Sequence, residues 1–134
     1  MAKSKFPPLL HLSYVLQQSA EEMLEREAGV GLSAARIMSV LDKSSAVSQR
    51  DIAVGLRQTE ANVSRQLRNM KKQGLVSITR NKKDSRQRDV SLNSKGARKY
   101  QDAQKILKKQ QRQFLKILNA GEAAAFETAA QKLA

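Results

Sequence analysis

The spacing of apolar residues along the chain predicts a mostly helical protein. Apolar side chains recur at steps of three and four over six segments, which is the period of one helix face. The first predicted helix follows Pro7 and Pro8 and ends near Gly29. Its expected buried face consists of Leu9, Leu12, Leu16, Ser19 and Met23. A second helix, with Ser33 as its N-cap, carries Ile37, Met38 and Leu41 toward the core.

A third and a fourth helix follow with a very short connection between them. Ser48 is the expected cap of the third helix, with Asp51 at capping-box spacing and Ile52 and Leu56 facing inward. After a turn at Arg57 and Gln58, Thr59 caps the fourth helix, which Gly74 ends. The inward positions of the fourth helix are Val63, Leu67 and Met70. Two helices joined by a tight turn are typical of a helix-turn-helix unit.

Two β-prone runs, 75–79 and 88–92, come next and are separated by the polar stretch 80–87. Their alternation of apolar and polar residues predicts a β-hairpin with a long tip. Asn93 then caps a fifth helix, and Asn119 with Glu122 predicts a capping box for a sixth. The expected seam of the fifth helix is Tyr100, Ala103, Leu107, Gln110, Phe114 and Ile117, and that of the sixth is Phe126, Ala129, Ala130 and Leu133.

The sequence therefore predicts a mainly α fold, a winged helix-turn-helix with a two-stranded β wing. Residues 1–134 are expected to form one domain, in which 33–93 make the winged-helix lobe. The flanking helices, in 6–29 and 94–134, carry apolar stripes that one small lobe cannot cover. Covering these stripes requires a second copy, so we expect them to be dimerisation helices in a homodimer.

Composition excludes several classes of function. The 134 residues include no Cys and one His, so disulfides, thiolate nucleophiles, Cys-ligated zinc and a histidine-based metal site are not expected. We find no paired carboxylates, Ser-His-Asp set or Gly-rich phosphate loop, and we therefore expect no enzyme activity, metal or cofactor. No stretch approaches the roughly 18 apolar residues of a membrane span, and no export signal is recognisable. A cytoplasmic, nucleoid-associated protein is expected.

The charge is concentrated in the middle of the chain. The whole sequence has 25 Lys and Arg against 12 Asp and Glu, a formal charge of +13. Residues 57–99 contain 13 of those basic residues and 3 acidic ones, whereas 9–47 are slightly acidic. An excess of positive charge over a helix-turn-helix favours nucleic acid as the partner.

The fourth helix is predicted to enter the major groove of double-stranded DNA. With its apolar positions inward, the opposite side carries polar and basic residues. Asn62 and Arg65 lie in the first turns, where they can form paired hydrogen bonds with adenine and guanine. Thr59, Ser64, Arg68 and Lys72 are expected to hold phosphates. The predicted contact set of this helix is Thr59, Ala61, Asn62, Ser64, Arg65, Arg68, Asn69 and Lys72.

The hairpin tip with the residue that follows it, 80–88, has five basic residues in nine positions and is expected to act as a DNA-binding wing. Arg86 is placed to enter a narrow minor groove, with Asp84 orienting its guanidinium. The predicted wing contacts are Arg80, Lys82, Lys83, Asp84, Arg86 and Arg88.

In these segments the sequence resembles the MarR family of bacterial winged-helix transcription regulators. The resemblance rests on the stretches 48–53, 59–65, 74–76, 84–86 and 90–96, in that order and at consistent spacing. The Asp84-Ser85-Arg86 triplet, ten residues after Gly74, is its most specific element. The sequence departs from the family at Ile78, where Arg is usual, and at Lys82, near which Pro is common. Arg80 is a candidate replacement for the missing charge.

The resemblance implies a homodimer that binds a pseudo-palindromic operator and represses transcription. It also implies release by a small aromatic or phenolic effector. The candidate effector residues, between the dimer helices and the DNA-binding lobe, are His11, Tyr14, Val15, Arg36 and Met38. A histidine, a tyrosine and a methionine at such positions also fit a surface or core role.

Two other classes stay open from the residues alone. A basic architectural protein would coat DNA with little sequence preference, which suits the charge of residues 57–99 but not Asn62 and Arg65 at base-reading positions. A structured-RNA binder would need aromatic side chains near the basic segment to stack on unpaired bases, and the segment that forms the predicted motif and wing has none.

Overall fold

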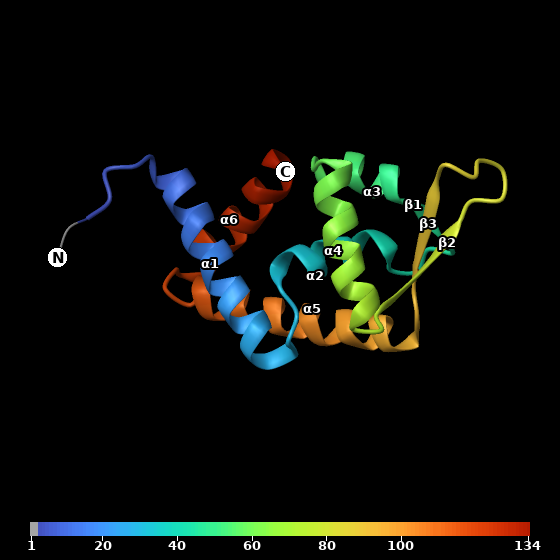
Figure 1. Cartoon of the computed structure of the whole chain (residues 1–134). Coiled ribbons are helices and arrows are strands. Elements are labelled where there is room, and N and C mark those ends of the chain that lie inside the picture. Colours follow the sequence, from blue (N-terminus) through green and yellow to red (C-terminus); the bar gives the residue numbers. More distant parts are fainter. Residues whose placement is uncertain (1–2) are drawn as a thin grey trace.

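Six helices and three short strands follow one another along residues 3–134, the part of the chain that the computed structural model describes (Figure 1). In chain order they are α1 (Pro8–Ala28), α2 (Leu32–Leu41), β1 (Val47–Ser48), α3 (Gln49–Leu56), α4 (Glu60–Lys72), β2 (Val76–Arg80), β3 (Arg88–Leu92), α5 (Ser94–Leu115) and α6 (Ala120–Leu133). The six predicted helices are confirmed, as is the mainly α, winged-helix fold.

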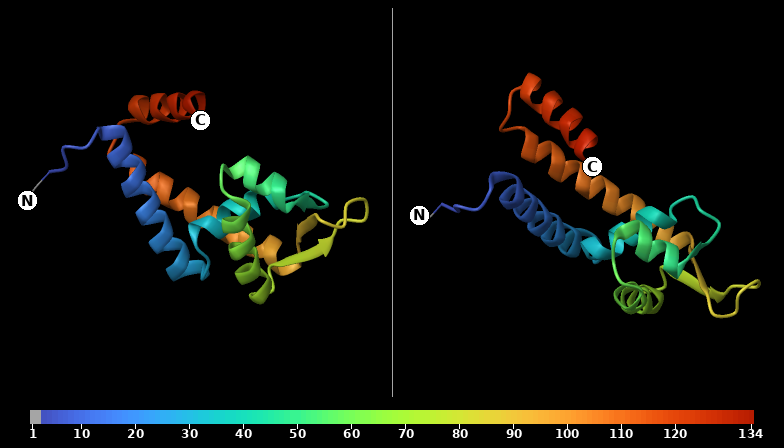
Figure 2. Two further views of the ribbon diagram at one scale, coloured as in Figure 1. Left: turned by 45° about the horizontal axis from the view of Figure 1, so that its top comes forward. Right: turned by 90° about the horizontal axis from the view of Figure 1, so that it is seen from above.

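The elements form an elongated molecule. The outer parts of α1 and α6 lie at one end, and the hairpin β2–β3 lies at the other (Figures 1 and 2). The helix α5 runs between these ends, and it packs against α1 and α2 along the way. The helix-turn-helix packs against α2, and α2 in turn packs against α1 and α5.

The hydrophobic core lies beneath the helix-turn-helix. As predicted, α4 buries Val63, Leu67 and Met70. These side chains join the buried side chains of α2 and α3, among them Ile37 and Ile52. One side of α4 is thereby fixed against the core, which leaves the other side free for solvent or a ligand.

Side-chain caps set most of the helix starts as the sequence predicts. Ser48, Thr59 and Asn93 each accept a backbone N–H from the third residue after them, and Asn119 with Glu122 forms a complete capping box. The prediction for α2 is wrong, because the helix begins at Leu32 and not after Ser33.

The cap of α2 comes from another helix. The Leu32 N–H donates a 2.7 Å hydrogen bond to Oε2 of Glu21, a residue of α1. A carboxylate that accepts from a helix N-terminus also interacts favourably with the helix dipole. Local sequence patterns cannot reveal this partner, which lies eleven residues earlier in the chain.

The predicted two-stranded wing is confirmed as β2 and β3, and a third short strand, which the sequence did not predict, extends the sheet. The strand β1 pairs with β3 through Val47 opposite Val90, and the strand order is β1-β3-β2, all antiparallel. Two residues are too few to show the alternation from which strands are predicted. β2 starts at Val76, one residue later than expected, because the Leu75 N–H bonds back to the Met70 carbonyl at the end of α4.

The junction between α4 and α5 depends on a very close approach. The N-terminus of α5 sits against the backbone of Leu75, and a Cβ at Gly96 would collide with the Leu75 carbonyl oxygen. Three donor groups at the start of α5 then form hydrogen bonds with backbone carbonyls of residues 73–75, which directly follow α4. Asn93 donates from its backbone to Leu75 and from its side chain to Gly74, and Lys95 donates to the Gln73 carbonyl. The C-terminal end of α4 and the start of α5 are thereby joined by hydrogen bonds.

The terminal helices are less buried than the sequence suggests. In α1 the buried residues are Ala20, Leu24 and Ala28, whereas Leu9 is 67% exposed. Ile117 lies beyond the end of α5 and is 86% exposed, and α6 buries none of its residues. The predicted inward faces are therefore covered only in part within one chain. Met23 of α1 and Leu107 of α5 pack against the core, whereas Leu9, Ile117 and the predicted seam residues of α6 stay exposed, as expected of apolar stripes that one lobe cannot cover. In the described residues, no helix is both long and apolar enough to cross a membrane.

Candidate nucleic-acid interface

The turn between α3 and α4 sets the angle of the fourth helix. Arg57 adopts a left-handed conformation with φ of 54°, and the Gln58 N–H bonds to the Ala53 carbonyl. Thr59 then opens α4 with extended backbone, and its Oγ1 accepts the Asn62 N–H at 3.1 Å. The first turns of α4 consequently have a defined backbone, which is required of residues that contact base edges.

The two predicted base-reading side chains are hydrogen-bonded to each other. Nη2 of Arg65 donates to Oδ1 of Asn62 over 2.6 Å, and Nδ2 of Asn62 donates to Oε1 of Gln58 over 3.0 Å. Asn62 is half-buried, while Arg65 is exposed. This chain of bonds starts at the turn and ends at a guanidinium on the outer surface. Sequence reasoning missed Gln58, which faces Asn62 one helical turn earlier.

The eight residues of the predicted α4 contact set are mostly exposed. Asn62 and Ser64 are half-buried, and the remaining six residues of the set are exposed. The exposed ones are Thr59, Ala61, Arg65, Arg68, Asn69 and Lys72. The outer side of α4 therefore presents three cations together with neutral hydrogen-bonding groups.

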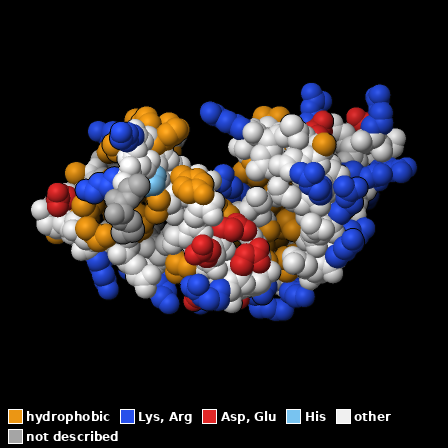
Figure 3. Space-filling model, turned by 60° about the vertical axis from the view of Figure 1, so that its left-hand side comes forward, with side chains coloured by type: hydrophobic (Ala, Val, Ile, Leu, Met, Phe, Trp, Pro, Cys, Tyr) orange, Lys and Arg blue, Asp and Glu red, His pale blue; other side chains and the backbone are white. Residues whose placement is uncertain are grey.

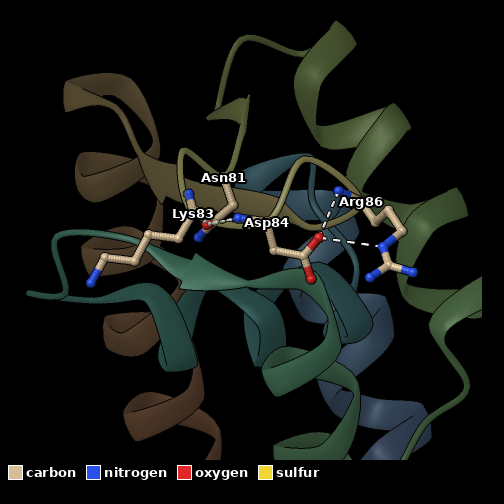
Figure 4. A network of polar contacts seen from close by, with 4 residues as sticks. All are labelled: Asn81, Lys83, Asp84 and Arg86. Carbon is tan, nitrogen blue, oxygen red and sulfur yellow. Dashed lines mark hydrogen bonds and ion pairs between the residues drawn. The ribbon is translucent and has the colours of Figure 1, made fainter.

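Asn81 organises the wing tip (Figure 4). Its Oδ1 accepts the N–H groups of Lys83 and Asp84 at 2.8 and 2.9 Å. Its Nδ2 donates to both carboxylate oxygens of Asp89 on the returning strand, at 3.2 and 2.9 Å. The Asn81 side chain thus holds the tip through hydrogen bonds, in a region where the MarR family often has a proline. No feature of the sequence alone singled out Asn81.

The predicted pairing of Asp84 with Arg86 is present. Oδ1 of Asp84 accepts the Arg86 N–H at 3.0 Å and lies 3.5 Å from Nε of Arg86 (Figure 4). The Arg86 side chain is 93% exposed, so this ion pair orients the guanidinium and adds little stability.

The strands below the tip place like charges together. Arg80 and Arg88 are direct cross-strand partners, and both are exposed. Like charges at such positions repel each other, and a phosphate between them relieves the repulsion. Lys82 and Lys83 are also exposed at the tip. Ile78, where the family usually has Arg, instead packs against the core, which leaves Arg80 as the cation at the end of β2.

A polar cleft of about 460 Å³ lies between the helix-turn-helix and the wing. The α3 start contributes Gln49 and Arg50, two residues that sequence reasoning missed. The complete lining is Gln49, Arg50, Glu60, Asp84, Arg86, Gln87 and Arg88. The cleft joins the predicted wing contacts to the beginning of α4, and its polar lining contains three arginines and two carboxylates.

The five candidate effector residues are not gathered in one place. Met38 is fully buried in the core, His11 and Tyr14 are exposed on α1, and Val15 is half-buried. Arg36 lines an open hollow of about 370 Å³ between α2 and α5. The hollow is completed by Leu32, Ala35, Ser39, Tyr100, Gln104, Leu107, Lys108 and Gln111. Most of these come from α5, where the sequence pattern indicated only a packing seam.

Solved structures share this fold over nearly the whole chain. A crystal structure of MarR has a TM-score of 0.88 at 13% identity, covering 99% of this chain and 92% of that one. The S. aureus MepR–DNA complex has a TM-score of 0.78 at 19% identity, covering 98% and 97%. The PcaV transcriptional regulator from Streptomyces coelicolor, in complex with its natural ligand, has a TM-score of 0.78 at 19% identity, covering 99% and 96%.

The class that the fold defines is the winged helix-turn-helix proteins. Within this fold, residues 28–87 match the family model described as MarR family, which confirms the resemblance seen in the sequence. The segment 28–87 therefore belongs to the MarR family. It contains the helix-turn-helix and most of the wing. No curated protein sequence matches the chain.

Proposed function

We propose that this protein is a transcription regulator that binds double-stranded DNA in a sequence-specific manner. The observation that carries the proposal is the Asn62–Arg65 hydrogen bond of 2.6 Å at the start of α4. Asn and Arg are the side chains best suited to paired hydrogen bonds with adenine and guanine in the major groove. A sequence-independent architectural protein has no use for this arrangement, because phosphate contacts require only charge.

The charges around α4 supply the affinity in this proposal. Arg68 and Lys72 extend along the exposed side of the helix, where they hold phosphates. The wing follows the adjacent minor groove and inserts Arg86, whose guanidinium is oriented by Asp84. Among the solved structures with this fold, MepR has been crystallised in complex with DNA, which supports DNA as the partner.

We further propose that the protein acts as a homodimer on a pseudo-palindromic operator. Seven of the eight large hydrophobic residues with high exposure lie in 6–14 and 117–133, at the end of the molecule remote from the wing. Figure 3 shows hydrophobic side chains gathered around that end, while Lys and Arg gather at the other. A second copy would cover this apolar surface through the helices of 6–29 and 94–134 and leave the two lobes of 33–93 to bind half-sites. The half-sites would lie about 34 Å apart.

The regulatory direction that we propose is repression relieved by a small aromatic or phenolic acid. Arg36 would supply the positive charge for the acid in the hollow between α2 and α5, beside Tyr100 and Gln104. PcaV has been crystallised with a natural ligand on this fold, which supports a ligand-responsive regulator. Binding would release DNA only if the acid prefers a lobe arrangement that does not fit the operator.

Selection of bound fragments from a pool of random duplexes tests the proposal. We expect an enriched sequence with two-fold symmetry. The protein should bind it at least about 1,000-fold more tightly than a scrambled duplex of equal length at one salt concentration. Equal binding to both duplexes would contradict sequence readout. Sedimentation in the same buffer should show a dimer at micromolar concentration.

A further inference from the structure

The exposed flank of α5 carries a row of cations that the proposed function does not use. Its positions follow the heptad-like spacing of three and four residues. They are Lys95, Arg98, Asp102, Lys105, Lys109, Arg112 and Lys116, and we name them the α5 stripe. All seven are exposed, and six of them are basic. Since a helix rises 1.5 Å per residue, the stripe is about 31 Å long.

The stripe lies away from the predicted readout residues. Lys95 bonds to the Gln73 carbonyl at the C-terminal end of α4, whereas Asn62 and Arg65 lie near the N-terminal end. In Figure 1 the C-terminal end of α4 lies next to α5 near the bottom of the view, and α4 starts at the top. Lys109 of the stripe forms an ion pair with Glu27 on an exposed surface, with 3.8 Å between Nζ and Oε1. One weak pair leaves most of the positive charge uncompensated.

The shape and composition of the stripe fit the backbone of a DNA duplex. Its length is close to one turn of B-DNA, about 34 Å, and DNA presents one negative charge per roughly 1.7 Å of axis. A helix that inserts into a membrane surface needs a free apolar face, but α5 buries Ala103 and Ile106 in the core. Single-stranded nucleic acid favours aromatic stacking, and none of the seven positions is aromatic.

We propose that the α5 stripe is a second, sequence-independent binding site for double-stranded DNA. It extends the proposed function, since a protein bound through α4 can hold another duplex segment along α5. It is also independent of base readout, because phosphate contacts along a helix flank need only charge and spacing. The site would increase retention on chromosomal DNA around the operator.

Site-directed crosslinking tests the proposal, because the chain has no Cys and accepts a single introduced thiol. A thiol-linked photocrosslinker is placed at Gln113→Cys, an exposed position between Lys109 and Lys116. The matched control is Gln18→Cys, which is exposed on α1. The probe is a 40-base-pair duplex of random sequence, about four helical turns long. We expect crosslinks from position 113 and at least about tenfold fewer from position 18.

A triple variant then assigns the crosslinks to the stripe. Arg98→Gln, Lys105→Gln and Arg112→Gln together should reduce crosslinking at position 113 at least about tenfold. They should also reduce the salt slope of random-duplex binding by about 3 units, one for each lost phosphate contact. The control triple Lys3→Gln, Lys5→Gln and Lys132→Gln removes the same charge elsewhere and should change neither value.

Arg65→Ala, introduced together with Gln113→Cys, distinguishes failure of this proposal from failure of the proposed function. It should leave the crosslinks from position 113 unchanged, even if no selected operator is ever found. Equal yields from positions 113 and 18, or equal effects of the two triple variants, would overturn the second site. It would also be overturned if the stripe triple abolished binding to phosphatidylglycerol vesicles while the wild type failed to crosslink to the duplex.

Discussion

The guanidinium of Arg65 is held by Asn62 through a hydrogen bond of 2.6 Å, one helical turn into α4. The bond restricts both side chains before any ligand arrives, so less side-chain entropy is lost on binding. Asn62 is held in turn by Gln58, which belongs to the turn preceding the helix. The turn therefore orients Asn62 directly, and Arg65 through Asn62.

Arg65→Lys should separate base readout from charge. Lysine keeps the positive charge but lacks the planar fork that binds guanine through two bonds. We expect binding to the selected duplex to weaken about 10-fold or more, in line with about 1–3 kcal/mol for such a contact, with little change on scrambled DNA. Fluorescence anisotropy at fixed salt measures both affinities.

Lys72→Ala provides the contrasting case at the other end of α4. Lys72 is exposed in the last turn and is assigned to a phosphate. Its loss should weaken binding to all duplexes alike and flatten the salt slope by about one unit. If Arg65→Lys and Lys72→Ala act identically on selected and scrambled DNA, the assignment of readout to Arg65 is wrong.

Arg86→Ala should weaken binding most where A·T-rich sequence flanks the half-sites. The narrow minor groove of such sequence has the most negative potential, which favours an inserted arginine. Asn81→Ala leaves every wing cation in place but removes the bonds to Lys83, Asp84 and Asp89. It should reproduce part of the Arg86→Ala effect. Titrations with two flank compositions measure the difference, and equal losses on both flanks would remove the minor-groove role.

Gly96→Ala should destabilise the fold strongly. The added methyl group would collide with the Leu75 carbonyl oxygen, which is backbone and cannot rotate away. Overpacking of this kind costs about 1–3 kcal/mol, and the unyielding neighbour favours the upper end of that range. Gly121→Ala is the control, because its nearest atom is 3.5 Å away and α6 gains a better helix former. Urea unfolding compares the two variants, and similar midpoints would contradict the packing described at the α4–α5 junction.

Glu21→Ala should weaken the attachment of α2 to α1. The variant removes the acceptor of the Leu32 N–H, and loss of a helix cap costs about 1 kcal/mol. Glu22→Ala removes the same charge from an exposed neighbour and serves as the control. Thermal unfolding of both variants gives the comparison. A lower midpoint for Glu22→Ala than for Glu21→Ala would show that the cap is unimportant.

The parts of the fold that local sequence determines were predictable. Val63, Leu67 and Met70 identify the buried side of α4 by their spacing, and Thr59 and Asn93 mark helix starts by their side chains. What depends on distant partners was not. The Glu21 cap of α2 and the pairing of Val47 with Val90 each join residues far apart in sequence, and neither leaves a local pattern.

The candidate site divides in the same way. Asn62, Arg65 and Arg86 follow from residue type and helix or hairpin position. Gln58 and Asn81 do not, because their importance lies in the side chains that they hold. The apolar residues of α1 and α6 that one lobe was expected to leave uncovered include Leu9, Phe126 and Leu133, which are exposed. The apolar stripes of these helices were recognisable from their spacing, but how much of each stripe packs within one chain depends on contacts between helices far apart in sequence.

The most direct test of sequence readout by α4 is a base-by-base affinity profile of the selected duplex, measured for the wild type and for Arg65→Lys in one buffer. The account predicts that the wild type loses affinity at discrete positions of each half-site. At one of these positions, a guanine, Arg65→Lys should no longer discriminate. A flat wild-type profile, or an unchanged profile in Arg65→Lys, would contradict it.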